Sequence, residues 1–295
     1  MLKNSLDVVV SGEVLTRDQH LDCMRDYHDQ HSDWSERYFS RPSENGKSSY
    51  AVLNDSIGIP THADFQILDL GCGIGTFCKY LDINAGSKLV YTGVDISGQC
   101  LKSAEQIFSS SQVSFKLSAA DQLPFDDELF DAVVSHMAFT MFKPIPIAAK
   151  EAFRVLKHGG IFSVILPAVW SRCSQPNTAL DSGIRVIIKD IFPNYAKNYG
   201  GFGEPEFFSK AGIEKFLSIY PEISNLVIDE FEVDFSGSID EVLWGIKTFY
   251  WYQILSDDLK ISTEKRLIEL LHKVAGSYEK VHHSRKLALL RCEKV

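Results

Sequence analysis

The segment 67–76, with the sequence ILDLGCGIGT, constrains the fold of this chain more than any other. An apolar stretch typical of a buried strand runs into glycines at 71, 73 and 75. Glycine permits a tight turn and lets a ligand approach the main chain. A helix starting near residue 76 would add free N–H groups at its N-terminus. Asp69 would repel a pyrophosphate and attract an ammonium or sulfonium group, so the segment predicts a strand–turn–helix site for a cationic ligand.

Across residues 66–167, segments with the apolar pattern of a strand alternate with segments that have the pattern of a helix. This order predicts a mainly parallel α/β sheet. The expected strands are 66–70, 88–94, 113–117, 130–134 and 161–166, with a closing strand at 286–292. The expected helices are 76–81, 98–108, 147–156 and 238–255, with one or two more within 17–41. Ser238 and Glu241 form a capping box at the start of one of them.

Composition limits the class of partner. The chain has 295 residues, 45% of them hydrophobic, and a net charge of −9 without a cluster of Lys or Arg, which disfavours nucleic acid. No apolar run is long enough for a membrane helix, and the N-terminus is a poor secretory signal. The cysteines form no C-x-x-C pair, which indicates reduced thiols in a cytoplasmic protein. The histidine pairs lack metal-ligand spacing, so we expect no metal. Together with the charge and the lack of a long apolar run, this leaves small molecules as the expected partners, with no membrane.

Two further acidic residues follow expected strands. Asp95 ends the second strand, in GVDIS, where a carboxylate can accept hydrogen bonds from ribose hydroxyls. Asp121 follows the third strand, in AADQLPF, where it can accept from an adenine amino group. Carboxyl ends of parallel strands share one crevice, so these acids and Asp69 predict an adenosine-containing ligand. A dinucleotide site would need its third glycine at position 76, which is Thr76, so an NAD(P)-dependent oxidoreductase is disfavoured.

The motifs ILDLGCGIGT, GVDIS, AADQLPF, FDAVVS and RVLKHGGIF resemble those of the class I S-adenosylmethionine-dependent methyltransferases, in order and spacing. The resemblance implies an α/β, Rossmann-like, seven-stranded, mostly parallel sheet with an antiparallel last strand. A helical cap would come from the N-terminus and from insertions after the fifth strand. We accordingly expect a cap segment at 1–60 and a methyltransferase domain at 61–295, with substrate-covering insertions at about 168–205 and 238–280.

The same resemblance implies S-adenosylmethionine as the cofactor. Its methionine end would lie along the glycine turn, its ribose at Asp95 and its adenine near Asp121. The expected cofactor-binding residues are Asp69, Gly71, Cys72, Gly73, Gly75, Asp95, Ile96, Ala120, Asp121, Gln122 and His136.

His136, which follows the fourth strand, is the candidate catalytic base; the alternative is a histidine that only packs beside the cofactor. Aromatic residues in the flanking segments are expected either to line an acceptor pocket or to pack in the core. They are Tyr27, Trp34, Tyr38, Phe139, Phe142, Trp170, Tyr199, Phe202, Trp244, Phe249, Tyr250 and Trp251.

The sequence thus predicts methyl transfer from S-adenosylmethionine to a small apolar or aromatic molecule, with the acceptor atom (O, N or C) left open. The alternatives are a non-catalytic S-adenosylmethionine-binding interaction module and a methyltransferase that acts on a protein.

Overall fold

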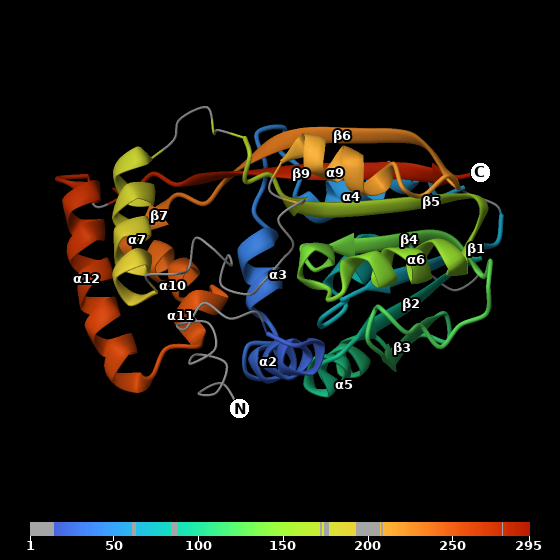
Figure 1. Cartoon of the computed structure of the whole chain (residues 1–295), viewed down its shortest axis with the longest axis horizontal. Helices are drawn as coiled ribbons and strands as arrows, with labels where there is room; N and C mark the ends of the chain where they lie inside the picture. Colours follow the sequence, from blue (N-terminus) through green and yellow to red (C-terminus); the bar gives the residue numbers. More distant parts are fainter. Residues whose placement is uncertain are drawn as a thin grey trace.

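A seven-stranded sheet organises the α/β part of the protein, with strand order β3-β2-β1-β4-β5-β9-β6 (Figure 1). The structure, a computed structural model, describes residues 15–60, 63–83, 88–171, 173, 177–192, 207, 209–278 and 280–295. The strands of the sheet are β1 (Phe65–Leu70), β2 (Leu89–Asp95), β3 (Val113–Leu117), β4 (Phe130–His136), β5 (Leu156–Pro167), β6 (Ile223–Asp234) and β9 (Ser284–Lys294). The predicted α/β class is confirmed.

Strand direction also agrees with the prediction. The pairs β1–β2, β1–β4, β2–β3 and β4–β5 are parallel. Strand β9 runs antiparallel to both of its neighbours, β5 and β6. The expected closing strand at 286–292 is therefore the antiparallel strand, and it lies inside the sheet rather than at its edge.

Helices cover both faces of the sheet because successive strand residues point in opposite directions. Leu68 and Leu70 share a buried cluster with residues of α6 (Ile145–Val155) and α9 (Lys210–Leu217). Ile67 points the other way and packs in a cluster with α4 (Ser49–Ile57). Helix α5 (Gly98–Ile107) follows β2 and is capped by the Ser97 side chain, which accepts from the backbone N–H of Cys100.

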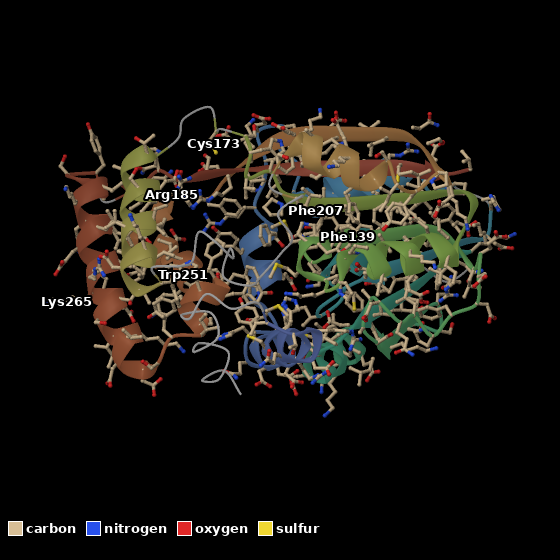
Figure 2. All side chains as sticks on the ribbon, in the orientation of Figure 1. Phe139, Cys173, Arg185, Phe207, Trp251 and Lys265 are labelled. Atoms are coloured by element: carbon tan, nitrogen blue, oxygen red, sulfur yellow. The ribbon has the colours of Figure 1, made fainter. Side chains whose placement is uncertain are left out.

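A second group of helices forms its own apolar cluster; most of it lies beyond the end of the sheet, whereas its helix α2 lies beside α5 (Figure 1). Its elements are α2 (Arg17–Gln30), α7 (Thr178–Ile191), α10 (Ile239–Lys247), α11 (Tyr250–Gln253), α12 (Asp257–Ala275) and the short strands β7 (Gly237–Ser238) and β8 (Lys280–Val281). Helix α3 (Trp34–Phe39) lies between helices α10 and α11 and the sheet. Trp251 belongs to the helical cluster, whereas Phe139 and Phe207 belong to a cluster at the sheet (Figure 2).

Two expected helices differ in the structure. Residues after the glycine turn form a short 3-10 helix, η1 (Thr76–Tyr80), because Leu81 is already extended, and segments this short favour i to i+3 bonding. A second 3-10 turn, η2, covers Phe139–Met141. The expected helix 238–255 is two helices, since α10 ends at Lys247 and Phe249 is extended.

Of the expected insertion at 168–205, the structure describes residues 168–171, 173 and 177–192, which include α7; its last part, 193–205, lies outside the described residues. In the described ranges, no helix combines the length and apolar character needed to span a membrane.

Candidate functional site

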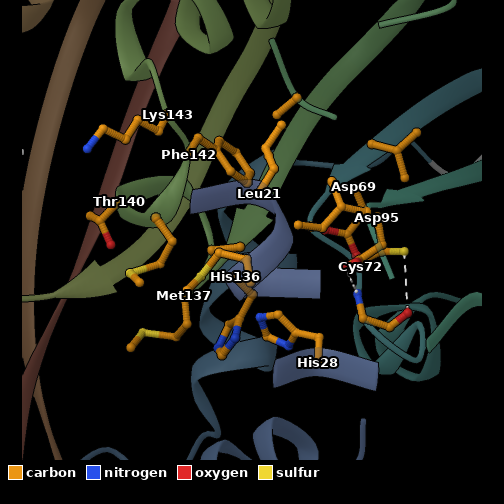
Figure 3. A pocket seen from close by; sticks show the side chains of 18 of the residues that line it. Leu21, His28, Asp69, Cys72, Asp95, His136, Met137, Thr140, Phe142 and Lys143 are labelled. Atoms are coloured by element: carbon orange, nitrogen blue, oxygen red, sulfur yellow. Dashed lines mark hydrogen bonds between the residues drawn. The ribbon is translucent and has the colours of Figure 1, made fainter. Parts of the chain in front are cut away.

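A cavity of about 250 Å³ lies where the carboxyl ends of β1, β2 and β4 meet helix α2 (Figure 3). This is the edge at which open parallel sheets bind ligands. The predicted residues in its wall are Asp69, Gly71, Cys72, Gly73, Asp95, Ile96, Ala120, Asp121 and His136. Gly75 and Gln122 are not in the wall. At Gly75 the left-handed φ of 74° serves the turn itself, and a Cβ there would lie 3.0 Å from the Phe115 ring.

Gly71 and Gly73 both have positive φ, 70° and 55°, but they differ in what surrounds the position of a Cβ atom. A Cβ at Gly71 would lie 2.5 Å from the Cβ of Ala138, so packing within the protein excludes a larger residue. A Cβ at Gly73 would meet no protein atom within 4 Å. Gly73 lines the cavity, so its missing side chain leaves room for a ligand.

The backbone N–H groups of the turn are already used inside the protein. Those of Gly71 and Cys72 donate to the Val94 carbonyl at 2.9 and 3.0 Å, and that of Gly73 donates to the Asp95 carboxylate at 2.8 Å. These three residues precede the helix N-terminus at which free N–H groups were expected, and their own N–H groups are not available to a ligand. The turn folds back onto β2, and η1 is too short for a strong helix dipole. The site is therefore built from carboxylates rather than from N–H donors.

Asp69 is the most deeply buried acid of the site, with 2% of its surface exposed. The Tyr91 hydroxyl donates to its Oδ2 at 2.7 Å, while Oδ1 has no hydrogen-bond partner among the residues that the structure describes. Burial raises the pKa of Asp69 to about 7; the Tyr91 bond opposes this rise, and the nearby charge of Asp95 adds to it. A cationic ligand beside this carboxyl group would therefore stabilise its charged form and could donate to Oδ1.

Asp95 stands at the end of β2, and 7% of its surface is exposed. Its Oδ2 accepts from the N–H of Gly73 and its Oδ1 from the N–H of Ser97, both at 2.8 Å. An ionised carboxylate offers about four acceptor positions, so about two stay available on the cavity side. They suit a pair of neighbouring hydroxyl groups.

Asp121 is held by a residue that the sequence analysis did not consider. Arg17, at the start of α2, donates from Nε to Oδ2 at 2.5 Å and from Nη2 to Oδ1 at 2.9 Å. The paired arrangement fixes both groups in one plane. It joins α2 to the loop after β3, at the end of the cavity lined by Ile96 and Ala120.

His136 ends β4 and has 9% of its surface exposed. Burial lowers its pKa to about 3, so the ring is neutral at neutral pH. Its Nε2 lies 2.8 Å from the Ser49 hydroxyl, and its Nδ1 has no partner within the described ranges. Figure 3 shows Asp69, Cys72 and Asp95 grouped together, apart from Met137 and Thr140.

Helix α2 contributes a wall that sequence reasoning missed. His20, Met24 and His28 recur every fourth residue and all line the cavity. His20 donates from Nε2 to the Met141 carbonyl at 2.6 Å, and His28 Nε2 lies 3.0 Å from the Tyr250 hydroxyl. The spacing was the available signal, since residues i and i+4 share one helix face.

Aromatic residues from both flanks enclose the rest of the cavity. Those expected from the sequence that line it are Trp34, Phe142, Phe249 and Tyr250. Those not expected are Phe39, Tyr50 and Phe77. Buried in the core instead are Tyr27, Tyr38, Phe139 and Trp251. Two other expected residues, Tyr199 and Phe202, lie outside the described residues.

Known proteins resemble the α/β part of the chain. Residues 68–164 match the family described as a methyltransferase domain. The chain is 32% identical over 106 residues to the probable phthiotriol/phenolphthiotriol dimycocerosates methyltransferase 2 of Mycobacterium ulcerans, covering 35% of this chain and 41% of that one. It is 30% identical over 157 residues to the ubiquinone/menaquinone biosynthesis C-methyltransferase of Agrobacterium fabrum, covering 52% and 58%. The chain spans about half the length of these curated relatives.

Solved structures share the fold. A putative methyltransferase from Bacillus halodurans aligns with a TM-score of 0.53 and 17% identity, over 83% of this chain and 98% of its own. The cyclase SpnF aligns with a TM-score of 0.57 and 15% identity, over 95% and 97%. A fold shared with a cyclase does not by itself define the reaction.

Residues 68–164 are thus similar to a methyltransferase domain. The sheet to which they contribute has an antiparallel β9 and carboxylates at the ends of β1 and β2, and its fold is shared with a solved structure described as a putative methyltransferase.

Proposed function

We propose that this protein binds S-adenosylmethionine in the cavity under α2 and transfers its methyl group to a small apolar or aromatic acceptor. One observation carries the proposal: Asp69 Oδ1 is buried without a donor from the described part of the chain. An unsatisfied buried carboxylate oxygen is costly, and an ammonium group on the ligand would relieve that cost. A pyrophosphate in the same place would add to it.

The other residues of the wall fit the remaining parts of this cofactor. Asp95 has acceptor positions for the ribose hydroxyls, and Asp121 has positions for the adenine amino group besides those that Arg17 uses. Gly73 leaves space beside the main chain. When bound, S-adenosylmethionine supplies an electrophilic methyl group on a positively charged sulfur.

The chain's own task is to orient the acceptor and keep water away from it. Trp34, Phe39, Tyr50 and Phe249 give part of the cavity an aromatic wall. Rings of this kind pack well against a planar apolar molecule. The name of the Agrobacterium fabrum relative, an enzyme of quinone biosynthesis, supports an acceptor of that type.

We assign His136 to contact with the acceptor rather than to removal of its proton. Burial holds the pKa of His136 near 3, which makes the imidazole a weak base and a good neutral hydrogen-bond acceptor. We also propose a cytoplasmic location, which cysteines spaced without a C-x-x-C pair support.

Calorimetric titration with S-adenosylmethionine, S-adenosylhomocysteine and NADH tests the cofactor assignment. We expect micromolar binding of both sulfur nucleosides and none of NADH. Absence of binding by either sulfur nucleoside would overturn the proposal. If they bind, label transfer from methyl-labelled S-adenosylmethionine to a panel of phenols and hydroquinones tests the acceptor class, and a panel of peptides serves as the opposing set.

A further inference from the structure

The His136 ring is fixed in orientation by its neighbours. Tyr50 stacks on it with the ring centres 3.7 Å apart and the planes 17° from parallel. Phe39 meets it edge-on, with centres 5.5 Å apart. Because a clamped imidazole does not rotate freely, its two nitrogens have separate and constant surroundings.

The hydrogen bonds around Ser49 decide which nitrogen carries the proton. The Ser49 hydroxyl, fully buried at the start of α4, donates to the Phe39 carbonyl at 3.2 Å and lies 2.8 Å from His136 Nε2. A hydroxyl has one proton and a carbonyl only accepts. With that proton on the Phe39 carbonyl, His136 Nε2 must be the protonated nitrogen and must donate to Ser49.

The opposite arrangement satisfies fewer groups. If Ser49 donated to His136 Nε2, the Phe39 carbonyl would lose this bond. The buried Nδ1–H would then have, among the described residues, only a contact with the carbonyl of its own residue, which does not reach hydrogen-bond geometry. Orphaned buried N–H groups are rarer than under-satisfied acceptors. The first arrangement leaves only a lone pair at Nδ1, on a residue that lines the cavity.

A second atom of opposite polarity lies in the same wall. The indole N–H of Trp34 is buried and has no acceptor among the residues described. Trp34 and His136 both pack against Phe39, with the Trp34 ring centre 5.7 Å and the His136 ring centre 5.5 Å from it. An aromatic wall that offers one acceptor and one donor fits a neutral ring with a hydroxyl group.

We propose that Ser49 is a positioning residue that holds His136 in the Nε2–H form, so that Nδ1 accepts a hydrogen bond from a hydroxyl group of an aromatic acceptor. The acceptor part rests on the proposed function. The assignment of the proton to Nε2 does not, and it is measurable in the ligand-free protein.

Nitrogen-15 NMR of the histidine rings tests the proton assignment, with His136→Phe identifying the resonances. We expect a protonated Nε2 and a non-protonated Nδ1 in the wild type. In Ser49→Ala we expect a mixture of both forms, and in Ser49→Thr, which keeps the hydroxyl, the wild-type pattern. Ser56→Ala is the matched control, because Ser56 lies on the same helix and its hydroxyl bonds the Leu53 carbonyl and Ser163 instead. A wild-type spectrum with the proton on Nδ1 would refute the inference.

Phenol and toluene, which have nearly the same shape, test the hydroxyl contact in protein saturated with S-adenosylhomocysteine. In His136→Phe the dissociation constant of phenol, divided by that of toluene, should rise by about five-fold, which is the effect of losing one net hydrogen bond. In Ser49→Ala this ratio should rise by less. Ser56→Ala should keep the wild-type ratio. An equal ratio in wild type and His136→Phe overturns the hydroxyl contact while leaving the proposed function intact. Failure of S-adenosylhomocysteine to bind overturns the proposed function, and the NMR result then stands by itself.

Discussion

Arg17 and Asp121 join helix α2 to the loop after β3 through two parallel hydrogen bonds, 2.5 Å and 2.9 Å long. The Arg17 side chain is 41% exposed, whereas that of Asp121 is 9% exposed. The pair is a clasp at the end of the cavity that Ala120 and Ile96 line.

Removing this clasp should speed the escape of ligand. In Arg17→Ala we expect S-adenosylhomocysteine to dissociate about two- to five-fold faster, because a partly exposed ion pair contributes up to about 1 kcal/mol. Stopped-flow displacement measures the rate. Arg25→Ala is the control, since Arg25 lies on α2 with similar exposure and pairs with Asp22 of its own helix. Equal rates in the two variants would show that the clasp does not retain the ligand.

Gly73 should be needed for ligand binding more than for folding. A Cβ there meets no protein atom within 4 Å, so Gly73→Ala should cost about 1–2 kcal/mol of stability through its positive φ alone. The same Cβ would enter the space of the ligand. A steric overlap that costs about 1.4 kcal/mol lowers affinity ten-fold, so the affinity for S-adenosylhomocysteine should fall by at least about that factor.

Gly159→Ala is the matched control, because Gly159 also has positive φ and open space around it but lies outside the cavity wall. Thermal unfolding and calorimetry should show similar destabilisation in both variants and lost affinity in Gly73→Ala alone. Wild-type affinity in Gly73→Ala would contradict the placement of the ligand.

Asp69 should make ligand binding depend on pH. Its pKa in the folded protein is about 7, above the usual 3.8, so the uncharged form is substantial at pH 6. An ammonium ligand favours the carboxylate, so affinity should rise between about pH 6 and pH 8 and binding at pH 6.5 should release protons. Calorimetry in buffers of different ionisation enthalpy measures this release. Asp69→Asn should bind weakly with no such release, and a wild-type affinity that is equal at both pH values would exclude the contact.

The raised pKa of Asp69 also affects stability in the ligand-free protein. A folded-state pKa above the usual one contributes stability that is full below pH 3.8 and is lost as pH rises through about 7. Ligand binding removes this loss by pairing the carboxylate. The rise in melting temperature caused by saturating S-adenosylhomocysteine should therefore be larger at pH 8 than at pH 6, and Asp69→Asn should abolish the difference.

Asp95→Ala should weaken the binding of S-adenosylhomocysteine by about 1–3 kcal/mol, because charge-assisted hydrogen bonds to the ribose are lost. The affinity of Asp95→Asn should lie between those of Asp95→Ala and the wild type, because the amide keeps one oxygen that can accept from the N–H of Gly73 or Ser97. Calorimetry at one pH gives the order, and denaturant unfolding separates ligand contacts from loosening of the turn. Undiminished affinity in Asp95→Ala would make the ribose assignment wrong.

The sheet was largely predictable because its signal is local. Strand β3 was predicted with its observed bounds, Val113–Leu117, and β1 within one residue. Apolar residues followed by Gly or Asp mark such strands wherever they lie. Strand β6 was missed because it is an edge strand rich in acidic residues, with a shift of register after Ser224.

The cavity wall was only half predictable for a physical reason. Asp69 lies near the end of β1 and Asp95 is the last residue of β2, so the parallel sheet itself brings them together. Ser49 meets His136 from 87 positions away, and Arg17 meets Asp121 from 104 positions away. Contacts of that range depend on how helices dock on the sheet, and no spacing in the sequence encodes them.

The inner position of β9 has a consequence for how the protein is made. It follows every other strand of the sheet in chain order, yet it lies between β5 and β6 and bonds to both. On the ribosome, β5 and β6 therefore emerge with unpaired edges that face each other across a gap. Until residues 284–294 leave the exit tunnel, these edges are open to wrong pairing, and unpaired strand edges are a hazard for aggregation.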